Sequence, residues 1–172
     1  MKKIFLHRLL IIGTALTLNT QVPAQTSHTT PFTVADAGTH SSLMTTLKAK
    51  HEKAYNHLIR TFPEAIVSGV HDEKDGTHIK ASVNGNTLRV QYDTKGRFSN
   101  SVLSYPCSEL KEAIADQVMQ AYPGFSIFSE VLEVKAGTNS ALFVMIENRK
   151  TWRRVRLTSE GIDVYEEYVK SN

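Results

Sequence analysis

Cysteine is nearly absent from this chain of 172 residues, which contains only Cys107. A single thiol cannot form a disulfide within the chain, so stability has to come from a packed core. Cys107 precedes a predicted helix, where a thiol can become a nucleophile, but a catalytic cysteine also needs a base. No motif links a histidine to Cys107. We therefore expect a small, partly buried side chain, with a catalytic or redox role as the alternative.

Long apolar runs are also missing. The run LLIIGTALTL at residues 9–18 is too short to span a bilayer. It follows three basic residues and precedes Val22 and Ala24, the small residues of a cleavage site, an order typical of a secretory signal peptide. We predict a signal peptide over residues 1–24, cleaved after Ala24, with an uncleaved anchor as the alternative. The rest of the chain is then expected to be periplasmic or secreted, in a bacterium, without stable membrane insertion.

A surplus of positive charge disappears once this segment is set aside. Three of the 20 Lys and Arg residues and none of the 17 acidic residues fall within residues 1–24, so the remainder carries 17 of each. The sequence pI of about 9.0 therefore partly reflects the predicted signal peptide. Because phosphate binding requires surplus positive charge, we expect no nucleic-acid partner.

The usual sequence signatures of catalysis are absent as well. There is no Gly-rich phosphate loop and no nucleophile elbow. His71 and His78 flank a DEKDGT turn, and zinc accepts such ligands with nearby carboxylates, but their spacing matches no established motif. Glu109, Glu112 and Asp116 lie on a predicted helix with an apolar stripe, which favours a solvated face over acid–base chemistry. We assign no catalytic residue, no metal ligand and no cofactor.

What the sequence does contain is a helical period followed by a strand period. Apolar residues recur at helical spacing from Leu43 to Phe62, and Pro63 ends that helix. Residues 25–42 before it have no period and are expected to be a poorly ordered leader. Four strand-like runs follow, and the NGN turn between the second and third is typical of a hairpin. These strands are predicted at residues 66–70, 78–83, 87–93 and 98–105.

The same order then occurs a second time. Apolar residues spaced by four predict a helix from Leu110 to Tyr122, and strand-like runs follow at 126–134, 140–147, 151–157 and 162–168. Phe62-Pro63 matches Tyr122-Pro123 at an offset of 60, and RVQYDTKG matches RVRLTSEG at an offset of 65. We therefore predict an α+β fold made of two αββββ units in tandem, over residues 43–105 and 106–172.

The motifs TFPEA and AYPGF, with the strand ends YDTKG and LTSEG, resemble those of the PepSY-like family of exported bacterial proteins. This family has the architecture of β-lactamase-inhibitor proteins, and the resemblance covers residues 43–168. It implies that both helices pack on one face of an antiparallel sheet whose other face is open. Related domains occur in protease propeptides and secreted inhibitors, where they bind proteins, and the family pattern contains no catalytic residues. The second copy has Leu157-Thr158 at the position where the first copy has Tyr92-Asp93. Because of this departure from the pattern, the resemblance does not identify a particular partner.

The strands of the second unit are apolar on both faces. Alignment of the hairpins shows Lys80 and Ser82 of the first unit replaced by Phe143 and Met145. Aromatic, Met and Arg side chains are enriched in protein-binding hot spots. The alternatives are that this face is covered within the monomer, or that the register is displaced by one residue. The candidate binding residues are Phe143, Met145, Trp152, Arg154, Arg156 and Tyr165.

The sequence thus favours an exported, non-catalytic protein-binding module of the protease- or enzyme-inhibitor kind. Its partner is expected to be another envelope or extracellular protein. The alternative is a periplasmic carrier of a small ligand or a metal, bound on the same sheet face or at the hairpin of His71 and His78. An enzyme would depend on Cys107, the nucleophile that stands before a predicted helix.

Overall fold

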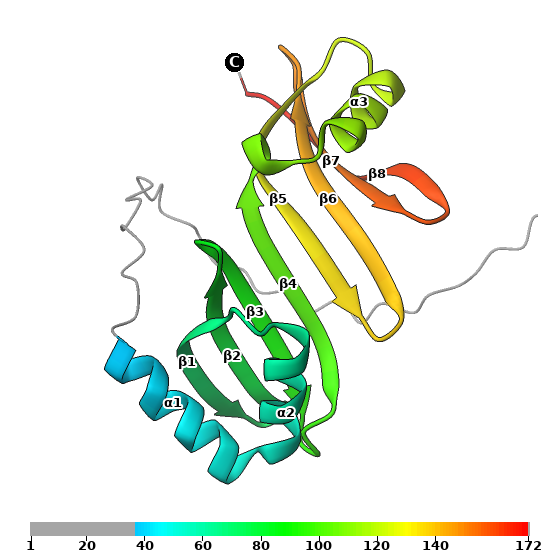
Figure 1. Cartoon of the computed structure of the whole chain (residues 1–172). Coiled ribbons are helices and arrows are strands. Elements are labelled where there is room, and N and C mark those ends of the chain that lie inside the picture. The colour runs from blue at the N-terminus through cyan, green and yellow to red at the C-terminus, as the bar shows by residue number, and fades with distance from the viewer. Residues whose placement is uncertain (1–36, 172) are drawn as a thin grey trace, which may run out of the picture. The chain divides into compact units, whose positions relative to one another are not determined.

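The computed structural model describes residues 37–171, and the predicted signal peptide lies outside them (Figure 1). All predicted strands are present, with ends that differ from the prediction by at most three residues. The elements in chain order are α1 (Ala37–Lys50), α2 (Glu52–Thr61), β1 (Ile66–Glu73), β2 (Gly76–Val83), β3 (Asn86–Asp93), β4 (Phe98–Pro106), the 3₁₀ turn η1 (Cys107–Glu109), α3 (Glu112–Ala121), β5 (Ser126–Ala136), β6 (Asn139–Glu147), β7 (Thr151–Thr158) and β8 (Gly161–Val169).

The strands form a single open sheet of eight strands in sequence order, and each neighbouring pair is antiparallel. This arrangement confirms the predicted α+β class with an antiparallel sheet. Helical segments precede each set of four strands. That the two halves are copies of one duplicated unit stays a prediction.

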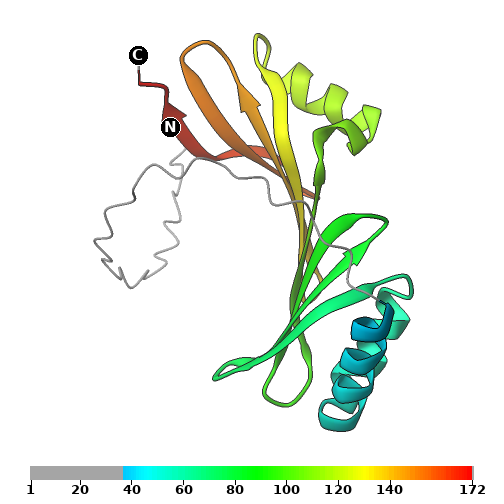
Figure 2. The ribbon, with the colours of Figure 1, turned by 90° about the vertical axis from the view of Figure 1, so that its left-hand side faces the viewer.

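The helices pack on one face of this sheet, which we call the helix-side face. Residues directly opposite each other on neighbouring strands point to the same face. One row of opposite residues crosses the sheet from β2 to β7, and its two ends lie in the cores of the two halves. Figure 2 shows the helices on one side of the strands. The row consists of Ala81, Leu88, Leu103, Glu133, Leu142 and Leu157.

Each half has its own hydrophobic core on the helix-side face. In the first half, buried side chains of α1 and α2 meet those of β1 to β3, among them Tyr92, which is fully buried. In the second half, Val118 of α3 meets five buried aliphatic residues of β5, β6 and β7. The predicted helical stripes therefore contribute to both cores. The second core consists of Val118, Val131, Val144, Ile146, Val155 and Leu157.

The first helix differs from the prediction of one helix that starts at Leu43. It begins at Ala37, within the predicted leader, and it is interrupted at His51. The His51 side chain reaches the strands, since its Nε2 lies 2.9 Å from Asp72 Oδ1 and its Nδ1 lies 3.3 Å from Thr77 Oγ1. His40 lies in the part of α1 that precedes the predicted start at Leu43. Its Nδ1 accepts a 2.9 Å hydrogen bond from the backbone N–H of Val67. Both differences arise from contacts with the sheet, which helical spacing does not record.

Candidate functional site

The predicted binding residues of β6 and β7 lie on the face opposite the helices, which we call the open face. Phe143 is directly opposite Arg156, and Met145 is directly opposite Arg154. They alternate along their strands with Val144 and other fully buried residues of the helix-side core. Because successive strand residues point to opposite faces, these four side chains point away from the helices. Among residues 37–171, no helix lies on this face.

Trp152 shares the open face with the two arginines, because it is two residues from Arg154 on the same strand. Its side chain is 42% exposed, and its ring centroid lies 6.3 Å from that of Phe128. Its Nε1–H donates a 3.2 Å hydrogen bond to Glu147 Oε2. Lys170 Nζ also binds Glu147, at 2.6 Å, and this hydrogen bond holds the pKa of Glu147 below its usual value.

Tyr165 reaches the same face through a β-bulge in β8. Arg154 is opposite Glu166 and Val155 is opposite Val164, so Tyr165 is the extra residue between them. Its ring meets Phe143 edge-on, with centroids 5.1 Å apart, and it remains 52% exposed. The guanidinium of Arg156 lies 5.8 Å from its centroid. We call Phe143, Met145, Trp152, Arg154, Arg156 and Tyr165 the aromatic–arginine cluster.

Both arginines of this cluster are paired with carboxylates of β8. Arg154 Nη1 lies 2.7 Å from Glu166 Oε2. Arg156 donates two hydrogen bonds to Asp163, of 3.0 Å from Nε and 2.9 Å from Nη2. These pairs restrict both guanidinium groups, and the pair with Asp163 holds that of Arg156 beside Tyr165. The sequence predictions did not include Phe128, Asp163 and Glu166. The strand period of IDVYEEY, in which Asp163 follows the core-packed Ile162, was an available signal for Asp163.

The open face of the first half carries histidine, basic and amide side chains where the second half carries aromatic ones. A hollow of about 290 Å³ lies on it, and its walls include two histidines, two basic residues and two amides. Asn100 Nδ2 donates a 2.8 Å hydrogen bond to Gln91, and Gln91 Nε2 donates a 2.7 Å hydrogen bond to Asp75. The histidine, basic and amide residues in the walls of the hollow are His71, His78, Lys80, Arg89, Gln91 and Asn100.

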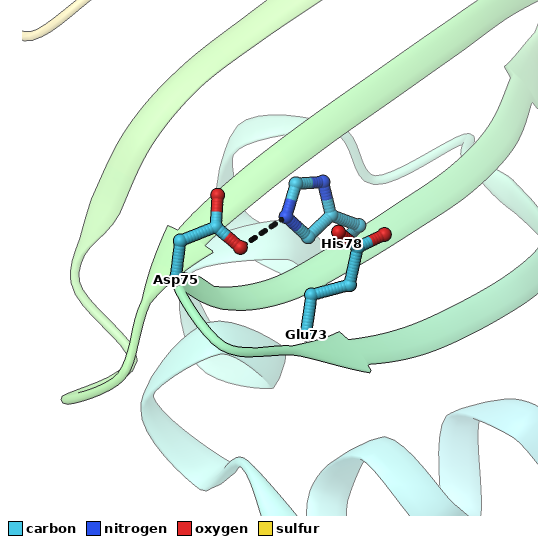
Figure 3. Close-up of side chains that lie close together, drawn as sticks. All are labelled: Glu73, Asp75 and His78. Carbon is cyan, nitrogen blue, oxygen red and sulfur yellow. Dashed lines mark hydrogen bonds and ion pairs between the residues drawn. The ribbon is translucent and has the colours of Figure 1, made fainter.

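The hairpin of His71 and His78 differs in detail from what the sequence indicated. The two histidines are directly opposite each other on β1 and β2. However, His78 meets Asp75 and Glu73 rather than His71, and possible metal-ligating atoms of these three residues lie within 4.8 Å of one another (Figure 3). Asp72 points to the helix side, where it contacts His51 and Thr77. The spacing of these residues in the sequence matches no established metal-binding motif, so the sequence predicts no metal ligand here.

Cys107 lies in η1, half-buried against the core of the second half. The described histidines have their contacts in the first half, for example His57, whose Nδ1 lies 3.0 Å from the Tyr92 hydroxyl. Glu109, Glu112 and Asp116 are exposed, as the solvated-face interpretation predicts.

Comparison with known proteins shows the fold. The chain matches no known protein family and no curated protein. A BLIP-like protein from Bacteroides fragilis NCTC 9343 is similar in structure over 70% of this chain and 86% of its own, with a TM-score of 0.50 and 15% identity. A protein from Bacteroides eggerthii DSM 20697 that is described as "putative periplasmic" is similar over 69% of this chain and 87% of its own, with a TM-score of 0.50 and 12% identity. A DUF2874 family protein from Bacteroides ovatus ATCC 8483 covers 68% and 85%, with a TM-score of 0.50 and 11% identity.

These likenesses show that the described part of the chain has a BLIP-like fold, as the sequence resemblance implied. Membership of the PepSY-like family stays a prediction. Because the sequence identity to these proteins is low, the likeness shows a shared architecture and not a shared activity. No helix of the described residues is long and apolar enough to cross a membrane.

Proposed function

We propose that this chain is an exported, non-catalytic module that binds another envelope or extracellular protein through the aromatic–arginine cluster. The observation that carries the proposal is the exposure of large aromatic side chains on a sheet face that neither core uses. Trp152, Tyr165 and Tyr168 are 42%, 52% and 45% exposed. Trp152 and Tyr168 are directly opposite each other, and Tyr165 packs on Phe143. Exposed apolar patches of this kind mark interaction sites.

The composition of the cluster suits a protein partner. Tryptophan, tyrosine and arginine dominate binding hot spots because they combine large apolar contact area with hydrogen-bonding groups. Here the arginines are already ordered by Glu166 and Asp163, at 2.7 Å and 2.9 Å. A partner would therefore lose less side-chain entropy on contact with them. Because the predicted mature chain is formally neutral, affinity should depend on aromatic burial more than on long-range attraction.

Several further observations support export and this mode of action. The predicted signal peptide gives the route, and one structural neighbour is described as "putative periplasmic". The BLIP-like fold leaves one sheet face open among the described residues. We also propose that the chain belongs to the PepSY-like family and that its two halves arose by duplication of an αββββ unit. Its action on the partner is proposed to be inhibitory.

The experiment is an affinity capture from the envelope fraction of the producing cell, followed by titration of the captured protein. Wild type, Trp152→Ala and Ile59→Ala are compared, because Ile59 is also exposed but lies on α2. We expect Trp152→Ala to weaken binding by about 2 kcal/mol, roughly 30-fold, if Trp152 is a central anchor. Ile59→Ala should leave binding unchanged. Equal binding by all three proteins would remove the cluster as the binding site.

A carrier of a small anionic ligand is the second candidate, and a specific feature of the first half favours it. Lys80 and Arg89 are directly opposite each other, and neither forms an ion pair within residues 37–171. Like charges in this position repel each other, and an anion in the adjacent hollow would relieve the repulsion. Thermal unfolding with and without phosphate tests this candidate: a rise in Tm that Lys80→Gln abolishes supports it, and an unchanged Tm for wild type contradicts it.

A further inference from the structure

A second group of polar side chains lies at the tip of the β1–β2 hairpin, away from the aromatic–arginine cluster. Glu73 is the last residue of β1, Asp75 lies in the turn, and His78 is the third residue of β2. Their carboxylate oxygens and imidazole nitrogen lie within 4.8 Å of one another (Figure 3). We call these three residues the hairpin cluster. An imidazole and two carboxylates are ligands that zinc and similar divalent ions accept.

The backbone of the hairpin fixes this convergence. Glu73 lies two residues after His71, and His71 is opposite His78, so Glu73 and His78 both point to the open face. Asp75 is brought over them by the turn, which is closed by Gly76 with φ +142°. A Cβ at Gly76 would lie 1.9 Å from the carbonyl oxygen of Tyr92, so only glycine fits. The tip of the hairpin is therefore held against β3.

Side chains outside the cluster hold Asp75 in position. Asp75 Oδ2 accepts a 2.7 Å hydrogen bond from Gln91 on β3, and Gln91 Oε1 accepts a 2.8 Å hydrogen bond from Asn100 on β4. Metal-binding carboxylates commonly have such outer partners, which orient the ligating oxygen. The other oxygen, Oδ1, lies 3.0 Å from His78 Nε2.

The fold itself does not require these residues. The β5–β6 hairpin of the second half closes in the same way, with Ala136 opposite Asn139. Its tip reads Ala136-Gly137-Thr138-Asn139 and contains no histidine or carboxylate. A hairpin of this type is thus formed without a cluster of ligating groups, and the three residues of the first hairpin need another explanation.

We propose that the hairpin cluster binds a divalent transition-metal ion of the zinc class. Glu73 and Asp75 each supply a carboxylate oxygen, and His78 supplies Nε2, which exchanges its hydrogen bond with Asp75 for the metal. All three side chains retain contact with solvent, so water completes the coordination, as in zinc sites with an open position. This inference does not rest on the proposed function and holds whether or not a protein partner exists.

The test is a calorimetric titration of the full chain with zinc chloride at pH 7.5, together with thermal unfolding in zinc. Variants His78→Asn and Glu73→Gln remove one ligand each and keep similar size. The matched control is His71→Asn, because His71 is opposite His78 on the same face but its Nε2 lies near Gly69 instead. Zinc bound at histidines other than His71 and His78 contributes equally to all variants, so the difference between His78→Asn and His71→Asn reports on the hairpin cluster.

We expect His78→Asn and Glu73→Gln to weaken zinc binding at least tenfold and to remove the zinc-dependent rise in Tm. His71→Asn should bind within twofold of wild type. Circular dichroism without zinc checks that every variant folds. Identical titrations for wild type and His78→Asn would overturn the proposal, and so would an equal loss in His71→Asn.

Discussion

The two halves of the sheet have similar helix-side faces and different open faces. On the helix side, both halves bury aliphatic side chains of the same kind, such as Ile79 in the first and Ile146 in the second. On the open side, the first half presents histidine, lysine and amide groups, whereas the second presents aromatic and arginine side chains. Packing constrains the helix-side residues, since a buried position tolerates few changes. The open face is free to differ, and we infer that function lies there.

Two neighbouring residues on β6 test the difference between the two faces of the sheet, with the largest expected effect. Ile146 is fully buried on the helix side, and Met145 lies half-buried on the open face. We expect Ile146→Ala to lower the free energy of unfolding by about 2–5 kcal/mol, because truncation leaves a cavity. Met145→Ala should cost about 1 kcal/mol or less. Urea unfolding measures both, and equal losses would show that both faces of β6 are core.

The second comparison uses one glycine from each half. Gly76 has φ +142° and its Cβ would clash with backbone atoms of β3, whereas Gly137 has φ +59° and open space around it. We expect Gly76→Ala to destabilise the protein by about 3 kcal/mol, from backbone strain and overpacking together. Gly137→Ala should cost only about 1 kcal/mol, the price of left-handed backbone alone.

Thermal or urea unfolding of these two variants gives the result directly. A similarly small loss in the free energy of unfolding at both positions would mean that the backbone of the β1–β2 hairpin can adjust to a Cβ. It would contradict a rigid geometry of the hairpin cluster.

The smallest expected effect is a pH dependence confined to the first half. Burial, with a contribution from Arg60, lowers the pKa of His57 below 6.5. The folded state thus disfavours the charged imidazole, and the unfolded state binds more protons as the pH falls. Stability should be full above pH 6.5 and decrease slightly as the pH falls through the lowered pKa. Every histidine of the sequence lies at or before position 78, so the second half should not contribute.

Urea unfolding at pH 7.5 and pH 5.5 measures this dependence in wild type and in His57→Gln. The variant should lose part of the difference between the two pH values. A difference that is as large in the variant as in wild type would assign the effect to other groups.

Much of this fold could be predicted from the sequence, because alternation and turn residues are local signals. The HIKASV strand and the NGN turn both appear where they were expected. Features that depend on partners distant in sequence were missed. The break at His51 reflects its contact with Asp72, and the bulge that brings Tyr165 to Phe143 arises only when β7 and β8 pair.

The candidate site was predictable to the same degree. Strand period alone placed Phe143 with Met145, and Trp152 with Arg154, because a period of two leaves no other choice. Their pairing with Asp163 and Glu166 was not accessible, since cross-strand neighbours depend on the register. The hairpin cluster was missed for a similar reason: the turn brings Asp75 onto His78, and no known ligand spacing describes that geometry.

The most direct test of the account is site-specific photo-crosslinking in the envelope of the producing cell. A photoreactive phenylalanine derivative is introduced in turn at Trp152 and Tyr165 of the cluster, at Lys80 on the open face of the first half, and at Ile59 on α2. We predict crosslinks to the same protein from positions 152 and 165, and none from position 59. A crosslink from position 59 without one from 152 or 165 would contradict the assignment of the binding face. Crosslinks from position 80 alone would move the site to the polar half of the sheet.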